Sequence, residues 1–170
     1  MLVFYGGAIQ GNSDRQARAH VHRALIAAIR DAGCSVVSEH ASGSSCESTA
    51  ALLETSIGPL PPAGLQRTRY VRRKMIEAVE GPIGAAIFEV SVPSLGTGIE
   101  IAHAYLRPRM GLSAIPVVAL YEQGFWPNRL SSMIRGITAQ DVPHFCVLEY
   151  ASLQDAQALV KDCLGGLPGR

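Results

Sequence analysis

Residues 87–104 read Ile87-Phe88-Glu89-Val90-Ser91-Val92-Pro93-Ser94-Leu95-Gly96-Thr97-Gly98-Ile99-Glu100-Ile101-Ala102-His103-Ala104. An apolar strand runs here into a glycine-containing turn, and the turn opens a helix. Gly96 and Gly98 allow backbone N–H groups to approach a ligand, and the positive end of the helix favours an anion. The pattern predicts a small phosphate site that includes the hydroxyl of Ser94, with the carboxylate of Glu100 close by. The alternative is a plain strand-to-helix turn in which Glu100 only complements the helix dipole.

Length and composition favour one domain spanning residues 1–170. With 48% hydrophobic residues, the chain is long enough to bury a core and too short for two domains. A net charge of +1 and only 17% charged residues give no general attraction to nucleic acid or to an anionic membrane. The four cysteines lack metal-site spacing, nothing resembles a signal peptide, and no apolar run is long enough to cross a bilayer. We therefore expect a cytoplasmic protein with reduced thiols.

Strands and helices alternate along the chain. Apolar runs predict strands at residues 2–5, 34–38, 83–90, 114–121 and 144–150. Helical spacing predicts helices that begin at residue 13 or 14 and end at 31, and that cover 66–80, 96–106, 130–135 and 152–164. Residues 41–64 are rich in Ser, Gly, Pro and Ala, and are expected to be a lid or a disordered loop with a single helical turn over 49–54.

This alternation is typical of an α/β fold with a parallel sheet that is covered on both faces. For five strands, the doubly wound order 2-1-3-4-5 is favoured. A ligand then binds at the carboxyl edge where the winding reverses, between the loops after strands one and three. Those loops are residues 6–12 and 91–97, so the topology brings the predicted phosphate turn next to the first loop.

Four stretches of the chain resemble a known family. They are Phe4-Tyr5-Gly6-Gly7-Ala8-Ile9-Gln10-Gly11, Ser38-Glu39-His40, residues 88–101, and Leu130-Ser131-Ser132-Met133-Ile134-Arg135-Gly136. The chain resembles the nucleoside 2-deoxyribosyltransferase family, and most of all its branch of 2'-deoxynucleoside 5'-monophosphate N-hydrolases. The resemblance implies a flavodoxin-like fold, a homodimer and no cofactor. It also implies cleavage of the N-glycosidic bond of a deoxynucleotide or deoxynucleoside, by hydrolysis or by transfer.

The resemblance implies roles for single residues. Glu100 matches a glutamate that attacks the anomeric carbon and forms a covalent deoxyribosyl intermediate, which suits a carboxylate below an oxocarbenium-like centre. Ser94 and Gly96 match residues that bind the 5'-phosphate. Ser131 matches a serine that reaches this phosphate from the neighbouring subunit, and Met133 matches a residue near the base. Further pocket residues implied in the same way are Phe4, Gly7, Ala8, Ile9, Gln10, Gly11 and His40.

The first strand and loop depart from the family pattern. Phe4, Ala8 and Gln10 stand where the hydrolase branch has a tyrosine, a serine and an arginine. A hydroxyl and a guanidinium are therefore missing from the phosphate cradle. Each loss is expected to cost about 1–3 kcal/mol of binding free energy if nothing replaces it.

The sharper departure from the family pattern lies in the helix predicted over residues 66–80, which is rich in Arg and Lys. Lys74 stands where the family has an aspartate that contacts the sugar or assists the base. A lysine beside Glu100 holds the glutamate ionised, but it cannot accept hydrogen bonds as a carboxylate does. Glu77 and Glu54 are alternative carboxylates for this role. The cations near the start of this helix mark either a solvated face or a wall of the anion site: Arg67, Arg69, Arg72, Arg73 and Lys74.

Two functions of different classes fit these residues. The first is an N-glycosidase or deoxyribosyltransferase in which Glu100 is the nucleophile and Lys74 lies beside it. The second is a protein of the same fold that binds a nucleotide without cleaving it. A dinucleotide-binding Rossmann domain is disfavoured because the first loop lacks G-x-G-x-x-G, and no ligand cluster supports a metal site.

Overall fold

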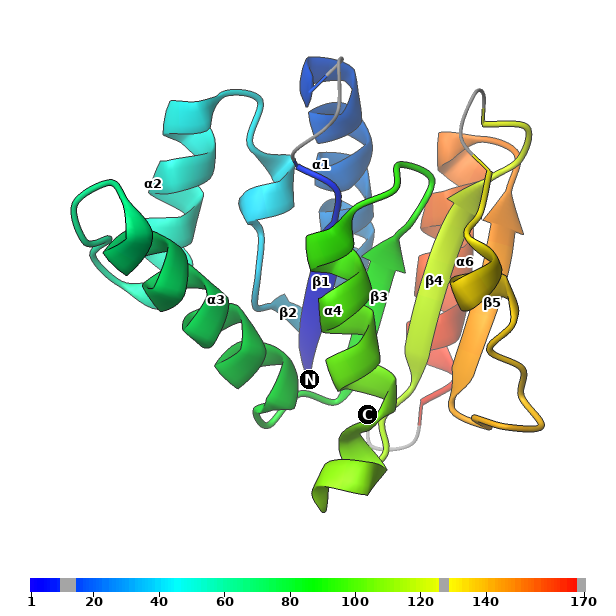
Figure 1. The fold of residues 1–170 in the computed structure, drawn as a ribbon. Helices are drawn as coiled ribbons and strands as arrows, with labels where there is room; N and C mark the ends of the chain where they lie inside the picture. Colours follow the sequence, from blue (N-terminus) through cyan, green and yellow to red (C-terminus); the bar gives the residue numbers. More distant parts are fainter. Residues whose placement is uncertain (10–14, 126–128, 168–170) are drawn as a thin grey trace.

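The protein was analysed as a computed structural model, which describes residues 1–9, 15–125 and 129–167. These residues form a five-stranded parallel sheet with the strand order β2-β1-β3-β4-β5 (Figure 1). The strands are β1 (Leu2–Gly7), β2 (Ser35–Val36), β3 (Ala85–Glu89), β4 (Val117–Glu122) and β5 (Phe145–Tyr150). The architecture and strand order confirm the prediction of a doubly wound, flavodoxin-like sheet.

Helices connect the strands and cover both faces of the sheet. They are α1 (Arg15–Asp31), α2 (Cys46–Ile57), α3 (Leu65–Glu80), α4 (Leu95–Tyr105), α5 (Ser132–Arg135) and α6 (Leu153–Gly165), with short 3-10 helices η1 (His40–Ser42) and η2 (Arg107–Met110). Helices α1 and α6 lie on one face, and α4 lies on the other, with α3 packed beside it (Figure 1). Strands β1, β3 and β4 are therefore buried on both sides, which explains their nearly continuous apolar runs.

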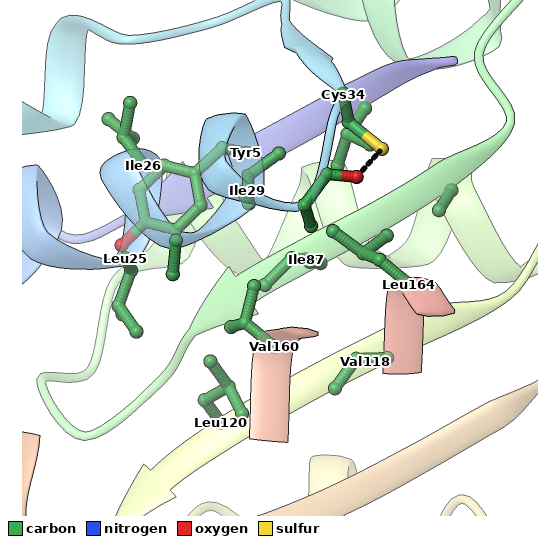
Figure 2. Packing of buried hydrophobic residues seen from close by; sticks show 14 of the residues in the cluster. Tyr5, Leu25, Ile26, Ile29, Cys34, Ile87, Val118, Leu120, Val160 and Leu164 are labelled. Atoms are coloured by element: carbon green, nitrogen blue, oxygen red, sulfur yellow. Dashed lines mark hydrogen bonds between the residues drawn. The ribbon is translucent and has the colours of Figure 1, made fainter. Parts of the chain in front are cut away.

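Successive strand residues enter two separate cores, because side chains alternate across a sheet. Tyr5 and Ile87 pack beneath α1 and α6, in a cluster that also contains Leu25, Ile29, Val118, Leu120, Val160 and Leu164 (Figure 2). Phe4 and Phe88 face the opposite side, where their ring centroids lie 5.7 Å apart. This second core contains Val79 of α3 and Ile101 and Ala104 of α4, so it fixes both helices against this face of the sheet.

Strand β2 is shorter than the predicted strand over residues 34–38. Its pairing with β1 covers only Ser35 and Val36, followed by one further bond from the Val37 N–H to the Val3 carbonyl. Ser38 then adopts a φ of 122°, a conformation that residues with a side chain rarely take. This turn ends the strand and directs the chain into η1.

The structure corrects the expectation of a single helical turn in residues 41–64, because the helix found there is longer. Cys46–Ile57 form a regular helix, although its composition resembles that of a loop. Ser45 and Ser48 form a capping box, in which each side chain accepts a hydrogen bond from the other's backbone N–H. The serines that suggested a loop therefore start the helix α2, which stands beside α3 (Figure 1).

No helix within the described ranges is long and apolar enough to cross a membrane. No disulfide bond joins the four cysteines, all of which lie in the described part of the chain. Among those same residues, no group of three or more His, Cys, Asp or Glu side chains is arranged to hold a metal ion.

Candidate functional site

Helix α4 begins directly at the turn after β3. Ser94 is its N-cap, and its hydroxyl oxygen accepts a hydrogen bond from the backbone N–H of Thr97 at 3.3 Å. The first N–H groups of a helix have no acceptor inside it, so those of Leu95 and Gly96 remain for an anion. The predicted phosphate turn is therefore the start of a helix, with a hydroxyl and exposed backbone at its positive end.

A buried polar group anchors the turn that precedes α4. Glu89, at the end of β3, accepts hydrogen bonds from the backbone N–H and the hydroxyl of Ser91. Its other carboxylate oxygen lies 2.7 Å from a guanidinium nitrogen of Arg18 on α1. The Ser91 hydroxyl oxygen also accepts a hydrogen bond from the backbone N–H of Glu122 at 2.8 Å. The chain is thus fixed to β4 and α1 just before it reaches Ser94.

A cavity of about 590 Å³ opens at the carboxyl end of β1, between the start of α4 and the pair α2 and α3. Its volume lies in the range of about 300–1,000 Å³ that small-molecule sites occupy. The first crossover contributes Gly7 and Ile9, and α4 with its cap contributes Ser94, Gly96, Thr97, Ile99 and Glu100. The loops that follow β1 and β3 therefore share one cavity, as the strand order predicts.

Glu100 reaches the floor of this cavity. A Cβ atom on Gly6 would lie 3.1 Å from a carboxylate oxygen of Glu100, so the carboxylate rests against the backbone of β1. Burial raises the pKa of Glu100 from 4.5 to about 7, and no charged neighbour offsets this effect. Among the described residues that line the cavity, Glu100 is the only carboxylate.

His40 enters the same cavity from η1. Its imidazole is 8% exposed, and its Nδ1 lies 3.1 Å from the hydroxyl of Ser38. The Ser38 hydroxyl also lies 3.7 Å from the sulfur of Met75, which connects this turn to α3. Burial, together with the charge of His22, lowers the pKa of His40 to about 4. His40 is therefore a neutral hydrogen-bonding group at physiological pH.

Helix α3 supplies a basic wall. Arg67, Thr68, Val71, Arg72 and Met75 line the cavity, as residues three and four apart share one face of a helix. The Nε of Arg67 donates a hydrogen bond to the carbonyl oxygen of Pro61 at 2.7 Å, which holds this side chain in place. The sequence left open whether the five cations form a solvated face or a wall of the anion site. Two of them, Arg67 and Arg72, line the cavity, and the other three do not.

Six of the residues expected at the site lie around this cavity: Gly7, Ile9, His40, Ser94, Gly96 and Glu100. Phe4 does not, because its ring is fully buried against Phe88 in the core under α3 and α4. Ala8 is buried too, with 3% exposure, and does not line the cavity. Gln10 and Gly11 lie outside the described residues, so nothing tests their expected contacts.

Lys74 lies outside the cavity lining, which corrects the expectation that it stands beside Glu100. Its ammonium contacts a carboxylate oxygen of Glu77 at 2.8 Å on the outer flank of α3. At this level of α3 the cavity is lined by Arg72, Met75 and Ile76, which the helical period places on a different side of the helix from Lys74. The alternative carboxylates are absent from the lining as well. Glu77 contacts Lys74 instead, and Glu54 accepts a hydrogen bond from the Leu60 N–H.

Ser131 and Met133 line a second cavity of about 550 Å³ on the other side of α4. Ser131 caps α5, and its hydroxyl oxygen accepts a hydrogen bond from the Met133 N–H at 3.2 Å. Met133 is 80% exposed and Leu95 is 92% exposed. The two cavities share Ser94, Thr97 and Ile99, so they adjoin over the start of α4.

The α2 side of the site was missed by sequence reasoning. Cys46, Thr49, Ala50 and Leu53 line the cavity at helical spacing. The signal that could have found them is the pair of serines three residues apart, Ser45 and Ser48, followed by apolar residues at helical intervals. Helix α2 makes the cavity a cleft with walls on three sides.

The whole chain was compared with known proteins. A protein of Thermofilum pendens, provisionally named 2'-deoxynucleoside 5'-phosphate N-hydrolase 1, is 30% identical to it over 166 residues. The matched residues cover 98% of this chain and 96% of the relative. No protein-family model matches the chain. Because the match covers nearly all of both proteins, it includes each element of the sheet and both cavities.

Proposed function

The chain belongs to the family of 2'-deoxynucleoside 5'-phosphate N-hydrolases, and on this premise we propose that it hydrolyses the N-glycosidic bond of a 2'-deoxynucleoside 5'-monophosphate. The observation that carries the proposal is the position of Glu100, the only carboxylate among the described lining residues of the cavity. The same cavity contains the capped start of α4. A phosphate group and a reacting sugar carbon can therefore be bound by one helix.

In this proposal the start of α4 binds the 5'-phosphate. The hydroxyl of Ser94 and the backbone N–H of Gly96 donate hydrogen bonds to phosphate oxygens, and the helix dipole favours the negative charge. Glu100 follows Ser94 by six residues, which is about 9 Å along the helix axis. This separation suits a deoxyribose ring whose phosphate sits at the cap and whose anomeric carbon faces the carboxylate.

Glu100 is the nucleophile in the proposed reaction. Its carboxylate attacks the anomeric carbon as the bond to the base breaks, and water then cleaves the resulting ester. Only the ionised form attacks, and with a pKa of about 7 roughly half of the free protein carries it at neutral pH. His40, which is neutral, offers hydrogen bonds to the nucleotide without adding charge.

The test is release of free base from deoxynucleoside monophosphates, followed by chromatography. Wild-type protein is expected to release base and Glu100→Gln to release none above background. Glu149→Gln is the matched control, because Glu149 is an exposed carboxylate on β5 that pairs with Arg135. Equal release by wild type and Glu100→Gln would refute the proposal. Addition of a second base separates hydrolysis from transfer, since only a transferase forms the new nucleotide.

A binding protein without turnover is the second candidate, and the cavity lining favours it on one point. No carboxylate from α3 lines the cavity within the described ranges, so nothing replaces the aspartate that the family resemblance leads one to expect. This candidate predicts that nucleoside monophosphates raise the melting temperature and remain intact. Base release that depends on Glu100 excludes it.

We also propose that two copies of the chain associate through the second cavity. Its lining is mostly apolar, and Leu95 and Met133 expose large side chains there. Because this cavity adjoins the first over α4, Ser131 and Met133 of one copy would come close to the other copy's phosphate site. Light scattering is expected to give the mass of a dimer for wild type and of a monomer for Leu95→Asp. A monomeric wild-type protein with full activity would exclude the shared site.

A further inference from the structure

Helix α3 presents to the cavity a cation whose hydrogen-bond donors are unused. Arg72 lines the cavity, and within the described ranges it makes no hydrogen bond and no ion pair. Its neighbours differ: Arg67 is bound to the Pro61 carbonyl, and Arg73 and Lys74 both contact Glu77. Arg72 is therefore the guanidinium that a ligand in the cavity can engage without breaking a contact.

Arg72 and Glu100 lie on different walls of this cavity. Glu100 rests on the floor against β1, while Arg72 belongs to α3, which packs beside α4 (Figure 1). Burial is the sole cause of the raised pKa of Glu100, so no guanidinium is near enough to hold that carboxylate ionised. Because both groups line one cavity, a ligand bound there can contact Glu100 with one end and Arg72 with the other.

We propose that Arg72 donates hydrogen bonds to the departing base and stabilises the negative charge that develops on it, so that the protein favours bases with a carbonyl at C4 of a pyrimidine or at C6 of a purine. This inference rests on the proposed function and goes beyond it, since it names a catalytic residue and a substrate class. Arg72 would thereby assist the departure of the base. No carboxylic acid of α3 lines the cavity within the described ranges to do so.

The proposed step balances without any further reactant except water. The C1'–N bond breaks, its electron pair stays on the base, and an oxygen of Glu100 forms a bond to C1'. The base leaves as an anion that is paired with the guanidinium. Water then attacks C1' and releases the Glu100 carboxylate, and the proton from this water neutralises the base.

The preference for carbonyl-bearing bases follows from the donor set. A guanidinium has five N–H donors and no acceptor, so it pairs with carbonyl oxygens and not with exocyclic amino groups. Uracil and cytosine differ in this respect at one position, as do hypoxanthine and adenine. These two pairs are therefore matched probes of the contact.

The experiment measures kcat and KM for the 2'-deoxy 5'-monophosphates of uracil, cytosine, hypoxanthine and adenine. Arg72→Ala is expected to lower kcat by about 10²-fold for uracil and hypoxanthine, which carry a carbonyl at C4 and C6 respectively, as loss of a preorganised donor does. The loss should be much smaller for cytosine and adenine, which carry an amino group at these positions. Millimolar guanidinium ion should restore part of the loss. Arg69→Ala is the control, because Arg69 is exposed on the same helix and does not line the cavity; it should behave as wild type.

Three results would overturn the inference. If Arg72→Ala behaves as wild type while Glu100→Gln is inactive, the proposed function stands and the role of Arg72 is refuted. If Arg72→Ala loses activity equally on all four nucleotides, and the loss vanishes on deoxynucleosides without a phosphate, Arg72 binds the phosphate instead. If the wild-type protein releases no base from any of the four, the proposed function fails and this inference fails with it.

Discussion

Replacing Glu100 by glutamine is expected to stabilise the protein at alkaline pH. Burial raises the pKa of Glu100 from 4.5 to about 7 in the folded state. Below pH 4.5 the group is protonated in both states, and folding bears no electrostatic cost. As the pH rises towards 7, the unfolded chain loses the proton first, so stability falls. Above pH 7 the full cost applies, and the shift corresponds to about 3 kcal/mol.

The assay is urea unfolding of wild type and Glu100→Gln at pH 5 and pH 8. The variant should be more stable by about 3 kcal/mol at pH 8, and the difference should shrink to about 1 kcal/mol or less at pH 5. In a domain of this size the gain at pH 8 corresponds to a rise of roughly 6–12 °C in melting temperature. Glu149→Gln serves as the control, because removal of an exposed ion pair changes stability by only about 0–1 kcal/mol at either pH.

The reasoning is refuted if Glu100→Gln is no more stable than wild type at pH 8, or if the gain is the same at both pH values. The test does not depend on activity, so it examines the burial of the carboxylate alone.

The pH dependence of the reaction rate tests the proposed catalytic role of the same carboxylate. If the ionised form of Glu100 is the nucleophile, kcat/KM should rise about tenfold between pH 6 and pH 8 and then level off.

Three further predictions concern residues that hold the elements around the cavity in place. Gly6→Ala would place a Cβ 2.6 Å from the ring of Phe88, and the overpacking is expected to cost about 1–3 kcal/mol in thermal unfolding. Ser45→Ala removes the N-cap of α2 and should lower the urea-unfolding free energy by about 1 kcal/mol. Arg18→Met leaves the carboxylate of Glu89 buried without its cation and should cost about 3–5 kcal/mol at pH 7, part of which Glu89→Gln in the same chain should restore.

The sequence predicts best what one short segment determines by itself. Ser94, Gly96 and Glu100 lie within seven residues of a single strand-to-helix unit, so helix geometry fixes their mutual positions once the start of the helix is known. The alternation of apolar runs and helices likewise specifies the sheet, because few topologies satisfy it. The shared cavity then follows from the strand order.

Side-chain direction across distant elements was harder to predict. One residue along a helix turns a side chain by about 100°, and one residue along a strand moves it to the other face. Lys74 lies only one or two positions from the lining residues Met75 and Arg72, so a small error in the register of α3 decides whether a side chain faces the cavity. Phe4 belongs to a strand buried on both faces, so no polar alternation indicated that its ring enters the core.

The charges of the cavity must satisfy two opposing demands. In the proposed reaction Glu100 has to ionise although burial raises its pKa, and a phosphate in the same cavity adds a like charge that favours its protonated form. The positive end of α4 acts in the other direction because it offsets the phosphate charge, and the guanidinium of Arg67 on the facing wall adds to this effect. In the proposed reaction, we therefore expect the start of α4 together with Arg67 of α3 to let a phosphate and an ionised Glu100 occupy one cleft.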